Sequence, residues 1–495
     1  MRYLLGIDLG TSSVKSLLMD EQGGIVGTAQ RGYDIKKTRQ DYAEQDMEEL
    51  WEAARETLRE LTDTYPAEAG LIGGIGFSGQ MHGLVMVDKE GKPVRDAIIW
   101  ADQRSGKEIE EMYKVTGMEA YRGTIYNSLS TGFLAASLMW VRQQEPENFR
   151  RTVKVMLPKD YIRYKMCGCF GTDMSDASGT GIFDTGSRQW AWELMGKLGL
   201  PKNIFPDCHD SCEAAGEVTD WCQRETGLKK GTPVVYGGGD TPVQAVGNGM
   251  IKPGILSSNI GTACQTATIL DRPIHDRAYR TNTFSHCAKD TWMLMGANLS
   301  GGVALKWLRD SVLCMDSYEE MDALAGTVPA GSEGLLFLPY LNGERTPWND
   351  PDAKGIYLGL TLKHTRAHMI RSAMEGIVFG MKNSLEIFKE MGIEYRKIIA
   401  SGGGARGQTF LQIQADIFGK EIYVNQGEEQ ACIGAAILAG VGVGIYSDME
   451  EACEKVVHMR EETIIPNGEN HKIYEQRFRV FKEIYGRNKD LFVMN

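Results

Sequence analysis

The sequence lacks the long apolar runs of a membrane protein and the basic excess of a nucleic-acid-binding protein. No stretch of the chain approaches the roughly 20 apolar residues that span a bilayer, so no membrane partner is expected. Among the 495 residues, lysine and arginine number 54 and aspartate and glutamate number 66, for a net charge of −12. This acidic balance argues against a nucleic-acid partner. The first ten residues do not form a signal peptide, so we expect a cytoplasmic location.

Cysteine is also scarce, with 10 residues in the whole chain. This density does not form a disulfide framework, so we expect reduced thiols. Two local clusters contain metal-binding residue types, one at Cys167 and Cys169 and one at Cys208 and Cys212. Neither has the paired Cys-x-x-Cys spacing of a zinc site. We interpret both as ordinary thiols, with a metal site as the alternative.

The chain also lacks a P-loop around its glycine triplet at 402–404. No Lys-Ser or Lys-Thr follows these glycines. The triplet lies between a predicted strand at 397–400 and a predicted helix that ends at 418. Glycines in such a loop let a ligand approach the backbone closely, so Gly403 and Gly404 are candidates for contact with a nucleoside.

One motif is present in both halves of the chain. Residues 6–13 read Gly-Ile-Asp-Leu-Gly-Thr-Ser-Ser, and residues 258–263 read Ser-Asn-Ile-Gly-Thr-Ala. Each motif ends one strand pattern and precedes another, at 14–19 and 265–270, which predicts two β-hairpins. A hairpin tip of this kind offers free backbone N–H groups and a hydroxyl to phosphate oxygens. We therefore predict two related domains that hold one nucleotide between them, through Gly10, Thr11, Ser12, Gly261 and Thr262.

The order of the patterns predicts an α/β fold with mixed sheets. In the first half we expect strands at 4–9, 14–19, 25–30, 71–77 and 233–236, and a helix from 47 to 61 that Asp46 caps. The second half repeats this plan, with helices at 297–310, 366–391 and 428–440 and strands at 335–338 and 397–400. A Pro-Gly turn at 253–254 marks the boundary, so the predicted domains are 1–250 and 251–495.

Three further segments have distinctive compositions. Residues 121–228 are less periodic and rich in turn signals, which suggests an insertion that builds a substrate cleft. Residues 244–250 are small and apolar, and a helix there would cross to the second half. Residues 433–440 are also small, so a helix there could cross closely against another helix.

Two carboxylates end predicted strands next to glycines. Asp8 adjoins the first phosphate tip, where it would repel phosphate unless a cation lay between them. Since Mg²⁺ takes few direct protein ligands, Asp8 alone can hold it through water; the alternative is an Asp that caps its own turn. Asp240 follows three glycines that leave room for a substrate, so it is a candidate general base; the alternative is a helix N-cap.

A second group of candidates lies in the first half. Met81 and His82 follow a strand end, and His82 is either a partner of a sugar hydroxyl or a satisfied core histidine. Trp100, Asp102 and Arg104 alternate on one side of an extended stretch. They form either the polar wall of a sugar pocket or a strand edge with an Asp–Arg pair.

Together these motifs resemble those of the FGGY carbohydrate kinases, and within that family those of the xylulokinases. The matching segments follow one another along nearly the whole chain, at 7–11, 79–83, 157–161, 175–180, 238–240, 261–262, 338–347 and 402–406. The resemblance implies two actin-like domains of the ribonuclease-H type, with ATP and a sugar in the cleft between them.

The resemblance also implies a role for each candidate residue. Asp240 would be the general base, and Asp8 would support the Mg²⁺–phosphate group. Thr11 and Thr262 would lie at the two phosphate tips, with Gly403 and Gly404 near the adenosine. The implied sugar-binding set is Gln80, Met81, His82, Trp100, Asp102, Asp240 and Thr241.

The expected reaction is ATP-dependent phosphorylation of the terminal hydroxyl of a ketopentose, D-xylulose to D-xylulose 5-phosphate. Three positions depart from the xylulokinase pattern: Thr241 replaces the usual Asn, and Ala263-Cys264 replaces a common Ser-Gly. A site that hydrogen-bonds a hydroxyl discriminates strongly, so Thr241 bears on the choice of sugar. The alternatives are another ketose or polyol, such as ribulose or a pentitol, and an actin-like ATPase without a sugar. We also expect a homodimer.

Overall fold

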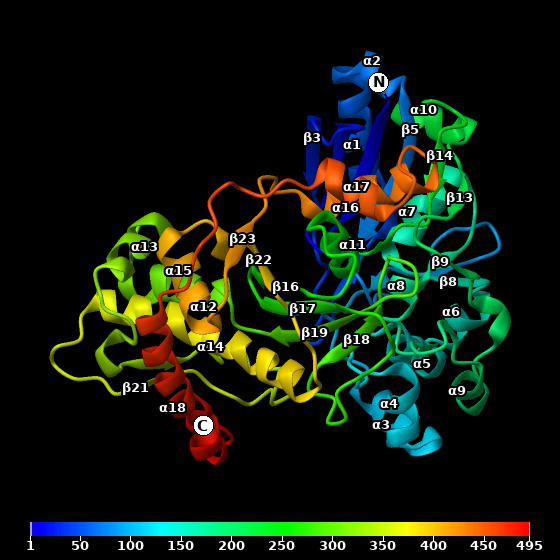
Figure 1. Ribbon diagram of the computed structural model, residues 1–495. Coiled ribbons are helices and arrows are strands. Elements are labelled where there is room, and N and C mark those ends of the chain that lie inside the picture. The colour runs from blue at the N-terminus through cyan, green and yellow to red at the C-terminus, as the bar shows by residue number, and fades with distance from the viewer. Residues whose placement is uncertain (1, 495) are drawn as a thin grey trace.

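The computed structural model describes residues 2–494 as two α/β bodies lying side by side, one from each half of the chain (Figure 1). The first half, blue to green, lies on the right of the view, and most of the second half lies on the left. Each body is built around one mixed β-sheet.

The first sheet contains seven strands in the order β13-β14-β5-β1-β2-β3, and β15 also pairs with β5. β1 is antiparallel to β2 and parallel to β5. The bounds are β1 Tyr3–Leu9, β2 Ser13–Asp20, β3 Ile25–Gly32, β5 Ile72–Gly79, β13 Ala214–Glu217, β14 Pro233–Val235 and β15 Gly238–Gly239. The strands predicted for this half are therefore confirmed, with ends shifted by one or two residues.

The second sheet contains six strands in the order β18-β19-β17-β16-β22-β23. Its central hairpin repeats the first, because β16 is antiparallel to β17 and parallel to β22. The bounds are β16 Ile255–Ile260, β17 Cys264–Leu270, β18 Asn282–Ser285, β19 Trp292–Asn298, β22 Lys397–Gly402 and β23 Ile422–Val424. Asp8 lies opposite Ser78 in the first sheet, and Asn259 lies opposite Ser401 in the second. The repeated plan read from the two motifs is confirmed.

Helix α1, Met47–Thr64, covers β2 and β3 with α7, Pro158–Cys167, and α10, Asp220–Thr226, beside it. Asp46 is its N-cap, and the Asp46 carboxylate accepts from the backbone N–H of Glu48 at 3.0 Å. Leu50, Leu58 and Leu61 recur at helical spacing and are buried. This helix is confirmed, and it extends three residues beyond the predicted end.

Two helices cross between the bodies. Helix α11, Asp240–Gly247, leaves the first half, and α16, Gln430–Gly442, comes back from the second half to pack on β1 and β5. Glycines allow this close approach: a Cβ on Gly434 would lie 2.1 Å from the carbonyl O of Val243, and one on Gly6 would lie 1.9 Å from that of Cys432. The predicted close crossing of the small-residue helix is confirmed, and its partner is α11.

Two element predictions are wrong in part. Residues 297–310 are not one helix, because β19 runs to Asn298 and α12 begins only at Gly302, ending at Trp307 before a π-helical turn at Leu308–Leu313. Ala297 and Asn298, the first two residues of the predicted helix, are instead held extended by pairing with Gln265 and Cys264 of β17. Helix α11 begins at Asp240, four residues before the predicted start, and carries Pro242 in its first turn, where no N–H partner is needed.

A subdomain with a hydrophobic core of its own, formed by residues between 84 and 205, lies below the first sheet in Figure 1. Its helices are α3 Gly106–Thr116, α4 Met118–Ile125, α5 Leu134–Gln144, α6 Pro146–Arg151, α8 Met174–Ala177 and α9 Trp192–Lys197. Short strand pairs complete it: β4 Glu44–Gln45 with β7 Ala97–Ile98, β6 Val85–Val87 with β8 Lys154–Met156, β9 Thr172–Asp173 with β12 Cys208–His209, and β10 Phe183–Asp184 with β11 Gln189–Trp190.

The core of the second body lies between its sheet and the long helix α14, Arg366–Glu390. The remaining helices here are α13 Tyr318–Gly326, α15 Gln408–Phe418 and α18 Gly468–Phe492, whereas α17, Met449–Val456, packs beside α16 on the first body (Figure 1). A separate hairpin pairs β20, Leu336–Leu338, with β21, Ile356–Leu358. The predicted helix at 366–391 and the strands at 335–338 and 397–400 are confirmed.

Candidate functional site

The first hairpin tip joins β1 to β2 and has backbone donors without partners. The Gly10 N–H donates to the Ser13 carbonyl at 3.0 Å and closes the turn, while the N–H groups of Thr11 and Ser12 make no hydrogen bond within residues 2–494. Two free N–H groups on one tip can donate to an anion. The phosphate contact predicted for this tip stays a prediction.

Asp8 lies at the base of this tip, near the end of β1. Its Oδ1 accepts a hydrogen bond from the Ser78 hydroxyl at 2.6 Å, and no other protein donor to the carboxylate is found in the described chain. Burial raises the pKa of Asp8, opposed by Ser78 and Lys15. A second oxygen is therefore left for a cation, and Mg²⁺ prefers oxygen ligands of this kind.

The second tip is one residue shorter than the first, since Ile260 pairs with Cys264 whereas Leu9 pairs with Val14, and it has a different residue at its base. The Gly261 N–H donates to the Ala263 carbonyl at 3.0 Å, and the N–H groups of Thr262 and Ala263 are unpaired within the described residues. Asn259 replaces the carboxylate and donates through Nδ2 to Gln244 of α11 at 3.3 Å. The second tip therefore offers donors to an anion without a negative charge beside them.

Gly402 and Gly403 of the glycine triplet line a cavity of about 250 Å³, together with Lys15 and Glu429. The contact of Gly403 with a nucleoside stays a prediction. Gly404 lies deeper, where a Cβ would come within 2.6 Å of the Ile260 Cβ, so it supports the loop and does not line the cavity.

Asp240 lies across β5 from Asp8. β1 and β15 flank β5, and Asp240 follows β15 as the first residue of α11. Thr241 donates both its backbone N–H and its hydroxyl to the carboxylate. Burial and the negative charge of Asp8 raise the pKa of Asp240 to about 7, against the opposing bonds from Thr241. A carboxylate with a pKa near neutrality is suited to take up a proton.

His82 faces the same region from the loop after β5. Its Nδ1 lies 2.6 Å from the Gly179 carbonyl, and its ring stacks on Phe133 at 4.3 Å between centroids. Burial lowers the pKa of His82 to about 4, so the ring is neutral at pH 7. A carbonyl can only accept, so Nδ1 carries the proton and Nε2 is an acceptor for a hydroxyl. The Met81 side chain packs against Gly239, directly before Asp240.

Trp100 connects the sugar candidates to the first tip. Its indole N–H donates to the Thr11 hydroxyl at 2.9 Å, and the side chain is 40% exposed. Gln45 donates to the Thr11 carbonyl at 2.7 Å, and Gln80 in turn donates to the Gln45 amide oxygen at 2.7 Å. Gln80 is 1% exposed, so it lies behind the tip and supports it through Gln45.

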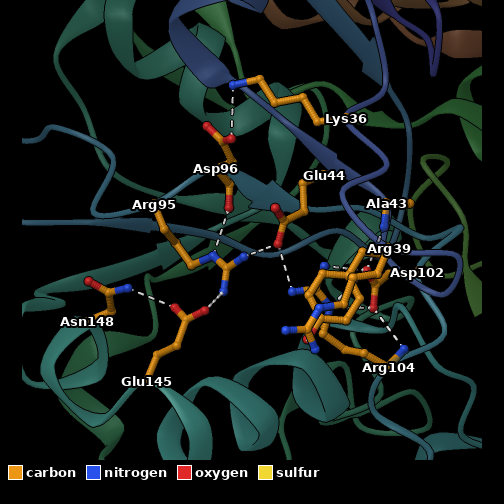
Figure 2. A network of polar contacts seen from close by, with 11 residues as sticks. Lys36, Arg39, Ala43, Glu44, Arg95, Asp96, Asp102, Arg104, Glu145 and Asn148 are labelled. Carbon is orange, nitrogen blue, oxygen red and sulfur yellow. Dashed lines mark hydrogen bonds and ion pairs between the residues drawn. The ribbon is translucent and has the colours of Figure 1, made fainter.

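Asp102, predicted to contact the sugar, has both of its oxygens bound to protein groups (Figure 2). Asp102 is 1% exposed, accepts from the Ala43 N–H at 2.7 Å and forms a two-oxygen ion pair with Arg104. The predicted Asp–Arg pair is observed, but not on an extended stretch: the Asp102 N–H donates to the Ile99 carbonyl at 3.0 Å and closes a turn. The backbone N–H of Ala43 binds the carboxylate on the buried side.

The wider network in Figure 2 holds the segments that carry Gln45 and Trp100. Arg95 and Arg104 both bind Glu44 of β4, and the contact from Arg104 measures 2.7 Å. Arg95 also reaches Glu145 at 2.6 Å. A linked set of ion pairs is worth more than isolated surface pairs. This network fixes β4 and β7 and therefore the two donors to Thr11.

The cysteine clusters do not form a metal centre in the described residues. No group of three or more His, Cys, Asp or Glu side chains there has a metal-binding arrangement. Cys167, Cys169, Cys208 and Cys212 are free thiols. His209 binds Glu213 at 2.9 Å and stacks on Tyr236.

Sequence reasoning missed Ser78, Gln45 and a buried ionic cluster around Lys159 beneath Asp240. Ser78 and Gln45 carry no motif of their own, because their partners come from distant parts of the chain. Lys159 lies in the segment 157–161 used for the resemblance, where a lysine next to an aspartate was the available signal.

Comparisons with known proteins cover nearly the whole chain. The model of the FGGY family of carbohydrate kinases, N-terminal domain, matches residues 3–247, and that of the C-terminal domain matches residues 256–443. A xylulose kinase of Bacillus subtilis is 34% identical over 491 residues, covering 99% of this chain and 98% of the relative. A gluconokinase of the same organism is 31% identical and covers 92% and 90%. A solved structure of a xyloylose kinase from Brucella ovis superposes with a TM-score of 0.93 at 32% identity, covering 99% and 100%.

Proposed function

We propose the following reaction for this chain, which belongs to the FGGY family of carbohydrate kinases: it transfers the γ-phosphoryl group of ATP to the terminal hydroxyl of D-xylulose. The product is D-xylulose 5-phosphate. One observation carries the proposal: Asp8 and Asp240 end strands on either side of β5, and the hairpin with its free donors begins beside Asp8. A phosphate site and a base thus adjoin at one edge of the sheet.

Asp240 accepts the proton of the substrate hydroxyl while that oxygen attacks phosphorus in line. Its pKa of about 7 matches this task, because the carboxylate is ionised in part at neutral pH and is a stronger base than an ordinary aspartate. The first turn of α11 and the two donors of Thr241 hold its orientation. The hydroxyl proton is transferred to Asp240. As the new bond to the sugar oxygen forms, the bond between the γ-phosphorus and the β–γ bridging oxygen of ATP breaks, and ADP is the leaving group.

The two tips and the glycine loop bind the nucleotide. The N–H groups of Thr11, Ser12 and Thr262 donate to phosphate oxygens and stabilise the charge on the transferring group. The cavity bordered by Gly402 and Gly403 receives the nucleoside. Binding between two bodies also favours closure, which excludes water from the phosphate.

Asp8 fits a Mg²⁺ ion. One of its oxygens is bound to Ser78 and the other is available, and one carboxylate with waters and phosphates meets the needs of this cation. When bound, Mg²⁺ neutralises phosphate charge beside a residue that would otherwise repel it. Calcium or no metal in place of magnesium is expected to abolish sugar phosphorylation, and magnesium is expected to restore it.

The sugar lies among His82, Met81, Trp100 and Thr241. The Nε2 acceptor of His82 takes a hydroxyl hydrogen, and the Met81 side chain covers the carbon skeleton. Thr241 is shorter than the Asn that is usual in xylulokinases, which leaves the choice between D-xylulose and another ketose to experiment.

The test is coupled ADP release with a panel of D-xylulose, D-ribulose, pentitols and gluconate, the last because of the gluconokinase relative. We expect the highest kcat/KM with D-xylulose and a loss of roughly 10²- to 10⁴-fold in kcat for Asp240→Ala. A higher kcat/KM with another sugar would overturn the assignment of D-xylulose as the substrate. An ATPase rate that no sugar changes would instead indicate the actin-like ATPase.

Two further features are proposals with tests of their own. The domain division at 250/251 can be tested by limited proteolysis, and the homodimer by light scattering. Among residues 2–494, no helix is long and apolar enough to cross a membrane. The cytoplasmic location is a prediction from the sequence alone.

A further inference from the structure

Five charged side chains lie completely buried beneath the candidate base. Lys159 and Arg163 come from α7, and the carboxylates are Asp160, Asp173 and Asp176, all with 0% exposure. The Lys159 ammonium lies 2.7 Å from Asp160, 2.7 Å from Asp173 and 3.2 Å from Asp176. Arg163 binds Asp160 at 2.8 Å and donates to the carbonyls of Gly171 and Tyr236.

The cluster brings opposite charges together out of contact with water. Burial raises the pKa of Asp176 well above its usual value, and the ammonium of Lys159 opposes this rise. Burying such a set is costly and contributes little net stability compared with apolar packing. What it contributes is fixed geometry, because an ammonium bound by three carboxyl groups cannot move without exposing unpaired charge.

Ser175 transmits this geometry to the strand that carries the base. Its hydroxyl donates to Asp173 Oδ1 at 2.5 Å and accepts from the Gly239 N–H at 3.1 Å. The same aspartate binds Lys159 through Oδ2. Gly239 directly precedes Asp240, so an unbroken chain of bonds runs from Lys159 to the base.

Lys159 also packs beneath the end of β5. A Cβ on Gly79 would lie 2.5 Å from the Lys159 Cβ, so the lysine stem lies directly against the strand that leads to Met81 and His82. The same cluster therefore lies under both strand ends that form the sugar side of the site, β5 and β15.

The segment 173–178 reaches the second body as well. The Ser178 hydroxyl accepts from the Ser285 N–H of β18 at 2.9 Å, and the Cys287 thiol lies 3.5 Å from the Ser175 hydroxyl. The segment 173–178, which binds Gly239, therefore also contacts β18, an edge strand of the second sheet. The bond from Ser175 to Gly239 links the base to this contact between the two bodies.

We propose that the segment 173–178, anchored by the buried Lys159 cluster, is the positioning element of the catalytic base, with Lys159, Asp173 and Ser175 as positioning residues. None of them contacts the sugar or the nucleotide. They act through the backbone of Gly239 and hold Asp240 where it meets the substrate hydroxyl. The inference rests on the proposed role of Asp240.

The first test compares Ser175→Ala with Ser137→Ala. Ser137 is equally buried, in α5 of the same body, and its hydroxyl has no hydrogen-bond partner in the described residues, which makes it a matched control. We expect Ser175→Ala to lower kcat about tenfold, since a displacement of an ångström or less has effects of this size. The ketose Kd by calorimetry should change no more than in the control, whereas the Tm should fall further than in the control, because Asp173 and the Gly239 N–H lose a buried partner. Equal kcat values for the two variants, measured well below Tm, would overturn the proposal.

A second variant tests the anchor. Asp173→Asn keeps an oxygen for the Ser175 hydroxyl but turns an amide toward Lys159, so it breaks the link to the cluster alone. We expect kcat to fall as in Ser175→Ala, and an unchanged kcat would remove Lys159 from the positioning role. Asp240→Ala is measured beside them: if it keeps activity, the proposed function fails, whereas if it is inactive and the positioning variants are normal, only this inference fails.

Discussion

Thr241 donates two hydrogen bonds to one oxygen of Asp240, from its backbone N–H at 2.6 Å and from its hydroxyl at 3.1 Å, both to Oδ1. Both bonds favour the ionised carboxylate, whereas burial and the charge of Asp8 disfavour it. The proton affinity of the base therefore depends on the residue at which this chain departs from the usual xylulokinase sequence. The hydroxyl that could have bound a sugar is turned toward the base.

The first prediction follows from that hydroxyl. Thr241→Val keeps the shape and the backbone bond but removes one donor to the charged form, so the pKa of Asp240 rises further. A hydrogen bond worth about 1 kcal/mol corresponds to roughly 0.7 of a pH unit. The acid limb of kcat/KM against pH, with its midpoint near 7 in the parent, should move up by about this amount. Thr241→Ser keeps the donor and should leave the limb in place; a limb that responds equally to both variants would contradict the assignment.

The second prediction concerns the stability cost of the base. The folded pKa of Asp240 is about 7 and its ordinary value is 3.8, so the folded state holds more protons than the unfolded state between these values. Stability must therefore fall as pH rises through this window. Asp240→Asn removes the cost and should raise the unfolding free energy at pH 8 by about 2 kcal/mol, less than the full shift because the site relaxes and admits water.

Chemical denaturation of parent and Asp240→Asn at pH 8 and pH 4 measures this difference. The difference in unfolding free energy between the two proteins should shrink toward zero at pH 4. There Asp240 is protonated in the folded protein and, in much of the population, in the unfolded protein as well. A variant that is inactive and also less stable than the parent at pH 8 would contradict the raised pKa.

Local pattern was enough to predict the two hairpins, the helix capped by Asp46 and the long helix α14. Their signals are periodic and short-range: alternating apolar residues, a capping aspartate, and Gly-Thr at a turn. The end of β19 was beyond such reasoning, because only pairing with β17 keeps Ala297 and Asn298 extended. Long-range packing is also the reason that helix α16 lies on the first sheet although its sequence is far into the second half.

The residues of the candidate site likewise fall into those that local pattern predicts and those that only the fold places. Asp8 and Asp240 were predictable because each ends a strand beside glycines that leave room for a ligand. The direction of the Asp102 side chain was not predictable, because it lies on a turn at 99–102 and its carboxylate is bound by the N–H of Ala43, far away in sequence. The Lys159 cluster was hidden for a related reason: its carboxylates come from two separate segments that only the fold brings together.

A third prediction tests the link between Trp100 and the first phosphate tip. Trp100→Phe keeps an aromatic ring but removes the N–H that donates to the Thr11 hydroxyl. Loss of a bond worth about 1 kcal/mol should raise the KM for ATP roughly fivefold. Trp192→Phe, at a similarly exposed tryptophan of α9, is the control and should leave both KM values unchanged. A change confined to the sugar KM would assign Trp100 to the sugar alone.

The last prediction compares two glycines inside helices. A Cβ on Gly434 of α16 would lie 2.1 Å from the Val243 carbonyl of α11, whereas one on Gly486 of α18 would meet nothing within 4 Å. Gly434→Ala should therefore force the crossing helices apart and lower the free energy of unfolding by about 1–3 kcal/mol. Gly486→Ala gains helix propensity without a clash and should raise it by about 1 kcal/mol. Thermal unfolding of both variants measures whether the stability falls for Gly434→Ala and rises for Gly486→Ala. Because α11 begins with Asp240, Gly434→Ala should also lower kcat. A Gly434→Ala protein as stable and active as the parent would show that α11 and α16 do not need this close contact to hold the base.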